Sequence, residues 1–434
     1  MNKNYIEKIK NKAIYFDEKA YENILNEIGN AQIVLLGEAT HGTKEFYEMR
    51  AEISKKLITE KNFNAITIEG DWPDAYQINN FITDDNFSDP KESLSVFNRF
   101  PTWMWQNTEI LKLIIWLKDF NKEKKEKINF FGLDLYSMYK SVDVIISYLE
   151  KVDAKAADEA KYYYSCFEQF RRDPQAYGYY VFSQLSESCQ NEVIQELKNL
   201  ENLQWKLIKE KKISQDDSFY LMQNAKVVKN SEIYYRSLYI NEVNNWNLRD
   251  SHMMETLEEI IKYYNKKGIK KPKIIVWAHN SHIGNSAFTQ MSLQEEFNIG
   301  QLVKEKFNNN SFSLGFTTYN GTVSAASNWD NPVERKIIRN ALPESYEFLF
   351  HQIGIANFLL ILNEKNLIPK NLLERAIGVV YMPQTERMSH YFYADLENQF
   401  DAVIHCDKTT ALEPLEKTSK WIDGEVPETY PSGL

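Results

Sequence analysis

Ionisable side chains at the ends of predicted strands are the part of this sequence best suited to chemistry. Four apolar segments end in this way, with Glu38 after LLG, Glu69 and Asp71 after ITI, Asp134 after FFGL and His279 after IIVWA. A single carboxylate at a strand end is usually a helix cap or a partner for arginine. The carboxyl ends of parallel strands meet at one edge of a sheet, however, where ligands bind in open α/β folds. Four strands ending alike therefore predict an active site at that edge.

The first of these strands runs into the motif GEATHG. Glu38 and His41 are three residues apart across a turn that contains Gly37 and Gly42, so both side chains can face one cleft. Imidazole can take a proton from water near neutral pH, and a neighbouring carboxylate orients it and stabilises its charged form. A turn histidine bonded to backbone is the plainer interpretation of the motif alone. Convergence of the strand ends favours His41 as a general base.

Arg50 lies in the helical segment that follows this motif. Phe46, Arg50, Ile53 and Leu57 share one stripe, which predicts that Arg50 faces the sheet. A buried guanidinium requires a carboxylate or a substrate oxygen. Glu38 is one candidate partner and Glu69 another, and both a structural ion pair and a direct substrate contact stay open.

The fourth strand ends in WAHNSHIGN, which places His279, Asn280 and His282 at the same predicted edge. A His-x-x-His pair can ligate a metal, but strong zinc sites add a third ligand and usually a His-Glu-x-x-His helix, which is absent. Hydrogen-bond donors or a second acid or base are the favoured roles. Arg249 and Asp250 form a neighbouring charge pair, a pattern typical of a solvated helix face.

The same sequence lacks the motifs of covalent hydrolases. No G-x-S-x-G elbow precedes a helix, and no cysteine follows a strand with a histidine partner. Activation of water by a general base is the chemistry that remains. Trp72 and Trp103 belong to no clear helical stripe, so we expect them, with Asp71 and Asn280, to bind a bulky apolar substrate.

The elements that must position these side chains alternate between strands and helices. Strands are predicted at 32–38, 63–71, 127–134, 271–279, 311–321, 376–381 and 400–406, with helices at 43–61 and 107–121 between them. Strands that are apolar at nearly every position are buried on both faces. This pattern predicts a three-layer α/β/α fold with a mainly parallel central sheet. Residues 140–268 read as a helical insertion, and 1–434 as a single domain.

Composition excludes several classes of protein. The chain has 434 residues and a formal charge of −10, which disfavours binding to nucleic acid. Its longest apolar stretch is far below the length that crosses a membrane. The sequence contains no phosphate-binding Gly-rich loop and therefore gives no support for a nucleotide cofactor. The three cysteines, Cys166, Cys189 and Cys406, are widely spaced and predict no disulfide framework. We expect a cytoplasmic protein with no cofactor and no membrane contact.

Several motifs in fixed order also resemble those of the erythromycin esterase family. They are GEATHG with Arg50 downstream, FNAITIEGDWPDAY, FFGLDLYS, RDSHMM, VWAHNSHIGN, GFTTYNGTVSAASNWD and ERAIGVVYMPQTERMSHYF. The resemblance implies a three-layer α/β/α fold and metal-independent hydrolysis of an ester, which is a macrolide lactone in the named members. It implies that His41 activates water, that Glu69 is its essential partner, and that Glu38, Arg50, His279 and His282 belong to the site.

Three hypotheses follow. The leading one is a metal-independent hydrolase of a small-molecule ester or macrolactone, with His41 as base and Arg50 or His279 steadying the oxyanion. The second is a metal-dependent hydrolase that uses His279, His282 and a strand-end carboxylate. The third is a non-catalytic ligand-binding protein on the same fold.

Overall fold

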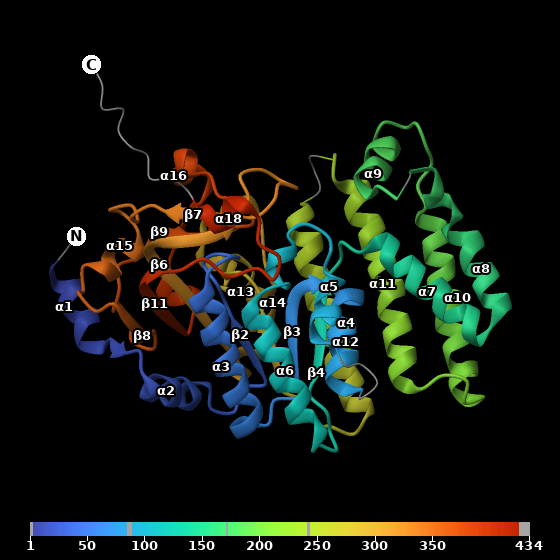
Figure 1. Ribbon diagram of the computed structural model, residues 1–434, viewed down its shortest axis with the longest axis horizontal. Coiled ribbons are helices and arrows are strands. Elements are labelled where there is room, and N and C mark those ends of the chain that lie inside the picture. The colour runs from blue at the N-terminus through green and yellow to red at the C-terminus, as the bar shows by residue number, and fades with distance from the viewer. Residues whose placement is uncertain (1–2, 85–88, 171, 241–243, 425–434) are drawn as a thin grey trace. The chain divides into compact units, whose positions relative to one another are not determined.

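A computed structural model describes residues 3–84, 89–170, 172–240 and 244–424 of the chain (Figure 1). The chain forms two compact units. The first consists of Met1–Thr67, Gln77–Phe130 and Pro272–Leu434, and the second of Ile68–Tyr76 and Phe131–Lys271.

The first unit is built on a mixed sheet whose centre is parallel. Its strands follow the order β1-β8-β11-β6-β2-β5-β3-β4, with β7 paired to β6, and β9 and β10 form a separate two-stranded sheet. The pairs β2 with β5, β2 with β6, and β6 with β11 are parallel, whereas β8 is antiparallel to β11. The strands are β1 (Ile14–Tyr15), β2 (Ile33–Leu36), β3 (Ala65–Asp71), β4 (Asn129–Asp134), β5 (Ile274–Trp277), β6 (Ser311–Ala325), β7 (Glu334–Ile338), β8 (Asn357–Ile361), β9 (Leu372–Arg375), β10 (Tyr391–Ala394) and β11 (Ala402–Thr409).

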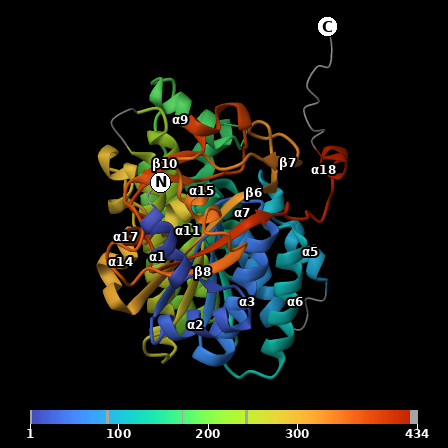
Figure 2. The same ribbon diagram turned by 90° about the vertical axis from the view of Figure 1, so that its left-hand side faces the viewer.

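Helices cover both faces of this sheet. In Figure 2, α3 and α6 lie on one side of the strands and α14 on the other. Every residue of β2 and β5 is buried, as expected for strands with a helix on each side. The helices of this unit are α1 (Lys3–Lys12), α2 (Glu18–Ile28), α3 (Lys44–Lys61), α5 (Pro90–Ser95), α6 (Thr108–Lys122), α13 (Asn280–Ile283), α14 (Ile299–Phe307), α15 (Tyr346–His351), α16 (Glu386–Ser389), α17 (Leu396–Gln399) and α18 (Ser419–Asp423).

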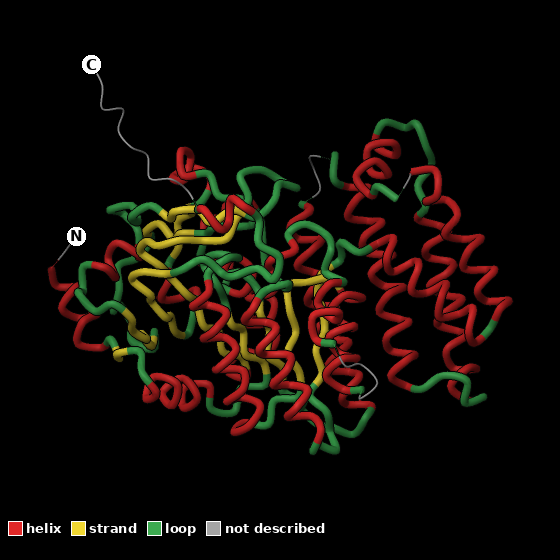
Figure 3. The backbone as a smooth tube through the Cα atoms, in the orientation of Figure 1, coloured by secondary structure: helices red, strands yellow, loops and turns green. Residues whose placement is uncertain are grey.

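The second unit holds the carboxyl ends of β3 and β4 and is otherwise helical (Figure 3). The helix α4 (Trp72–Thr83) begins in this unit. The others are α7 (Met138–Val152), α8 (Ala154–Tyr164), α9 (Pro174–Phe182), α10 (Gln190–Lys209), α11 (Gln215–Ser237) and α12 (Asn245–Lys266). Their apolar faces enclose a core of their own, in which Ile145, Leu149, Leu200 and Val228 are buried.

The predicted fold class is confirmed. The chain is a mixed α/β protein with a mainly parallel central sheet, and α7 to α12 occupy the predicted helical insertion. One strand prediction is wrong, because 376–381 makes only isolated bridges at Ile377 and Val380. The residues just before this segment form β9 instead, which pairs with β10 in the separate two-stranded sheet and ends at Arg375. The expectation of one domain over the whole chain stays a prediction.

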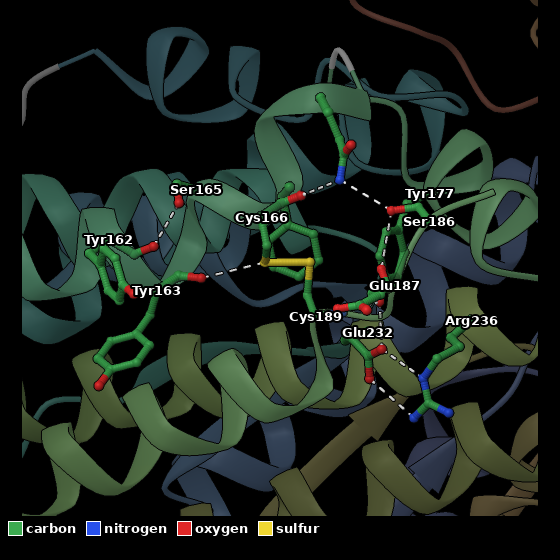
Figure 4. Close-up of a disulfide and its surroundings, with 12 residues drawn as sticks. Tyr162, Tyr163, Ser165, Cys166, Tyr177, Ser186, Glu187, Cys189, Glu232 and Arg236 are labelled. Carbon is green, nitrogen blue, oxygen red and sulfur yellow. Dashed lines mark hydrogen bonds and ion pairs between the residues drawn. A yellow bond between two sulfur atoms is a disulfide. The ribbon is translucent and has the colours of Figure 1, made fainter. Parts of the chain in front are cut away.

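The expectation that the cysteines form no disulfide is also wrong. Cys166 and Cys189 are joined in the second unit, with their Cα atoms 5.9 Å apart (Figure 4). The intervening α9 turns the chain back so that the start of α10 meets the segment after α8. Close by, Tyr177 donates to Glu232 at 2.6 Å and accepts from the backbone N–H of Cys189 at 3.0 Å. Spacing along the sequence carried no sign of this return.

Within the described residues, no helix is long and apolar enough to cross a membrane.

Candidate functional site

His41 and Glu38 form a buried pair in the first unit. Nδ1 of His41 lies 2.9 Å from Oε1 of Glu38, and both residues are almost wholly shielded from solvent. The turn between them is held close to β6, where the N–H of Ser324 donates to the carbonyl of Gly42 at 2.9 Å. A Cβ atom at Gly42 would lie 1.9 Å from the carbonyl oxygen of Ser324, so only glycine fits there. The motif therefore fixes the histidine against the carboxylate.

Arg50 completes this pair from the first turns of α3. Its Nη2 donates to Oε2 of Glu38 at 2.6 Å, and its side chain is fully buried. The guanidinium carbon lies 4.4 Å from the ring centre of Tyr47 and 4.6 Å from that of Trp277. Stacking on aromatic faces offsets part of the cost of burying a cation with a single carboxylate. The predicted partner Glu38 is confirmed, and Arg50 holds the acceptor of the histidine in place.

The loop after β5 brings a second histidine to the first. The rings of His41 and His279 are 4.8 Å apart between centres. Nδ1 of His279 accepts from the backbone N–H of Ser281 at 3.2 Å and lies 2.8 Å from the hydroxyl of the same residue. Asn280 is buried and its backbone N–H donates to the carbonyl of Glu38 at 2.8 Å, and His282 is buried on the short helix α13. Of the four strand ends that were predicted to share one edge, those of β2 and β5 bring His41 and His279 together in the first unit.

Glu69 belongs to another cluster, which lies in the second unit. Nη2 of Arg249 donates to Oε1 of Glu69 at 2.8 Å and to Oδ2 of Asp134 at 2.6 Å, and its Nε donates to Oδ1 of Asp134 at 3.0 Å. The guanidinium carbon lies 5.0 Å from the ring centre of Tyr136. Burial opposes the charge of Arg249, but Asp134 and Glu69 outweigh it and hold the pKa of the guanidinium well above its usual range.

Other predicted residues are buried in separate surroundings. Asp71 and Trp72 follow Glu69 in the second unit, where the indole of Trp72 stacks on Phe131 with ring centres 5.4 Å apart. Trp103 lies in the first unit within an apolar cluster that includes Trp421. Both indoles expose almost no surface, so their predicted role in substrate binding stays a prediction. The prediction that Arg249 and Asp250 lie on a solvated helix face is wrong. Asp250 is fully buried, and Arg249 forms an ion pair with Asp134.

Over the described ranges, no group of three or more His, Cys, Asp or Glu side chains is arranged so as to hold a metal ion.

Sequence reasoning missed the aromatic neighbours of Arg50 and the carboxylate partners of Arg249. Tyr47 lies three residues before Arg50 on one helix, a spacing that could have indicated the contact. Trp277, two residues before His279, points toward Arg50 although strand patterning assigns it to the core. Nothing in the sequence indicated that Arg249 would contact Glu69 and Asp134, which lie 180 and 115 positions earlier in the chain.

Comparison with known proteins identifies the class of protein. The family model described as erythromycin esterase matches residues 58–409. The chain therefore belongs to the erythromycin esterase family.

Two curated relatives align over most of their length. The erythromycin esterase type II of Escherichia coli is 22% identical over 404 residues, covering 89% of this chain and 91% of the relative. The putative hydrolase YbfO of Bacillus subtilis (strain 168) is 23% identical over 412 residues, covering 87% of this chain and 84% of the relative. The family and these relatives support a hydrolase acting on a small molecule.

Solved structures share the fold. A succinoglycan biosynthesis protein superposes with a TM-score of 0.72 at 22% identity, covering 95% of this chain and 98% of that one. An erythromycin esterase mutant in its open conformation superposes with a TM-score of 0.63 at 16% identity, covering 92% and 96%. At these identities the likeness concerns the fold alone.

Proposed function

We propose that this protein hydrolyses a carboxylic ester or macrolactone without a metal ion, with His41 as the general base that activates water. The observation that carries the proposal is the buried chain from Arg50 through Glu38 to Nδ1 of His41. Family membership and the esterase and hydrolase relatives support the reaction class.

The contacts of the two histidines assign them different roles. A carboxylate can only accept, so Nδ1 of His41 carries the proton and Nε2 presents the lone pair of a base. Nδ1 of His279 accepts from a backbone N–H, so the proton of its neutral ring is on Nε2, which can donate. One ring is set to take a proton and the other to give a hydrogen bond.

The reaction follows from these roles. His41 removes a proton from water as its oxygen attacks the ester carbonyl carbon, and Glu38 stabilises the imidazolium that forms. His279 donates to the oxyanion of the tetrahedral intermediate. Collapse of the intermediate breaks the bond to the alcohol oxygen, which takes the proton from His41. Arg50 fits the oxyanion role less well than His279, because it is fully buried and committed to Glu38.

Variants of these residues test the proposal. The parent is screened against bulky esters and macrolactones for products heavier by one water, with and without chelator. His41→Ala should lower kcat by about 10²–10⁴-fold while the fold, checked by circular dichroism, is kept. His351→Ala, a half-exposed histidine on α15, is the matched control and should retain activity. Near-parent kcat/KM for His41→Ala, or activity lost in chelator, would contradict the mechanism.

The role of Glu69 needs its own variant. We propose that it is a second essential carboxylate, as the family resemblance implies. Glu69→Gln keeps the shape of the side chain and an acceptor for Arg249 but removes the charge. Its kcat/KM should fall with unchanged folding, and parent activity would show that Glu69 serves Arg249 alone.

A further inference from the structure

Glu374 is a buried acid of the first unit that the mechanism above does not use. It lies on β9 and its side chain is fully shielded from solvent. Its Oε1 accepts from Nδ2 of Asn280 at 3.2 Å, and Oε2 has no hydrogen-bond partner among the described residues. A buried carboxyl group with one of its oxygens unsatisfied is costly and calls for an explanation.

Asn280 connects Glu374 to the catalytic loop. Its side chain makes a two-way bridge to Phe316 on β6, donating to the carbonyl at 2.7 Å and accepting from the N–H at 3.2 Å. Its backbone N–H donates to the carbonyl of Glu38. A Cβ atom at Gly37 would lie 2.2 Å from Oδ1 of Asn280, so the glycine before Glu38 makes room for this amide. The orientation of the amide thereby bears on Glu38 and on the neighbouring His279.

The chain that carries Glu374 also contacts His41 directly. Three residues beyond Glu374, the N–H of Ile377 donates to the carbonyl of Ala39 at 2.8 Å. The carbonyl of Ile377 accepts from the N–H of His41 at 3.2 Å. The turn from Glu38 to His41 is thus held on one side by Asn280 and on the other by the segment after β9, and Glu374 joins the two.

We propose that Glu374 is a positioning residue for the His41 base, which acts by fixing the amide of Asn280. The expected effect of Glu374 on catalysis rests on the proposed hydrolytic function. The structural coupling of Glu374 to His41 does not depend on that function.

The surroundings of Glu374 keep the acid protonated. Burial and the carboxylate of Glu347 on α15 raise the pKa of Glu374 to about 8, although the amides of Gln399 on α17 and Asn280 on α13 act in the opposite direction. Tyr346, also on α15, faces the group as well. Arg375 follows on β9 but donates to the carbonyls of Thr318, Tyr319 and Arg339. Ionisation would place a second negative charge beside Glu347, and the repulsion between the two carboxylates would displace Glu374 together with the amide of Asn280 that it holds.

The pH profile of kcat/KM on an ester substrate tests the effect of Glu374 on catalysis. The parent should lose about threefold or more between about pH 7 and about pH 9 as Glu374 ionises. Glu374→Gln, which cannot ionise, should retain kcat near pH 7 and abolish that decline, with KM unchanged. Glu196→Gln is the matched control, since Glu196 is a buried glutamate of the second unit whose pKa burial raises to about 7. The control should keep the parent profile.

Histidine NMR tests the coupling without any substrate. In the parent, the ring signals of His41, assigned with His41→Ala, should shift as the pH passes through the ionisation of Glu374, and in Glu374→Gln that shift should vanish. If no ester is hydrolysed while this shift is seen, the proposed function fails and the positioning role stands. An unchanged alkaline decline and an unchanged His41 titration in Glu374→Gln would overturn the inference, as would loss of activity in that variant at every pH.

Discussion

Arg50 and Arg249 both pair with strand-end carboxylates, yet they satisfy their charge in different ways. Arg50 is fully buried, meets the single carboxylate of Glu38 and lies against Tyr47 and Trp277. Arg249 keeps 14% of its side chain exposed and meets two carboxylates, Glu69 and Asp134. The first cluster pairs one cation with one anion away from solvent. The second places one cation between two anions, and part of the arginine side chain is exposed to solvent.

The difference shows what each arginine can do. In the first cluster, removing the cation strands a carboxylate away from water, so Arg50 is bound up with the stability of its unit. In the second, the two carboxylates repel each other without Arg249 but can be hydrated or protonated. We therefore expect the Arg50 cluster to lose more free energy of unfolding than the Arg249 cluster when its cation is removed, because no part of Arg50 is exposed to solvent.

Arg50→Met gives the largest expected effect. The variant leaves Glu38 buried without a counter-charge, which should cost about 3–5 kcal/mol of the free energy of unfolding. Chemical denaturation of the purified protein measures this loss. The double variant with Glu38→Gln removes the stranded charge and should recover part of it. A loss as small as that of an ordinary surface substitution would mean that water reaches Glu38.

The disulfide sharpens the comparison because only the second unit has one. Cys166 and Cys189 close a loop with a sequence separation of 23 residues. Opening it should cost about 3 kcal/mol by the entropy of loop closure. Thermal unfolding with and without a reducing agent measures the effect, and a Cys166→Ser, Cys189→Ser protein should no longer respond to the reductant. An equal response in that variant would place the effect elsewhere.

Arg249→Met should cost about 2 kcal/mol at neutral pH, since water and proton uptake relieve the two carboxylates. Without the cation their pKa values rise, so the folded variant binds more protons than the unfolded chain. Its deficit against the parent must then shrink as the pH falls toward the range where both acids are protonated. Urea titrations at several pH values check this, and Asp134→Asn in the same background should reduce the pH dependence to that of Glu69 alone. A deficit independent of pH would show that the charges of Glu69 and Asp134 do not cause the loss.

Tyr47→Phe gives the smallest effect. The ring that covers Arg50 is kept, and the hydroxyl is removed together with its hydrogen bond to the carbonyl of His41, which is 3.2 Å long. The loss should be about 1 kcal/mol of unfolding free energy. Tyr47→Leu, which removes the ring as well, serves as the comparison and should cost more. Equal losses in the two variants would show that the aromatic face does not support the arginine.

Local sequence determined one of the two clusters. Glu38, His41 and Arg50 lie within one strand, one turn and one helix, so the periodicity of that helix was enough to predict that Arg50 faces the sheet and meets either Glu38 or Glu69, and the structure selects Glu38. The parallel strands were predictable for the same reason, because their apolar runs and the helices between them are local patterns.

Tertiary structure alone decided the rest. Arg249 and Asp134 are far apart in the sequence, and a charged residue on a helix looks the same whether it faces water or a strand end. The pairing of Cys166 with Cys189, the break of the predicted strand at 376–381, and the buried acid of Glu374 depend likewise on which segments the chain brings back together. The spacing of residues predicts contacts within one turn, helix or strand. The contacts named above depend instead on which elements pack against each other, and the spacing does not predict that packing.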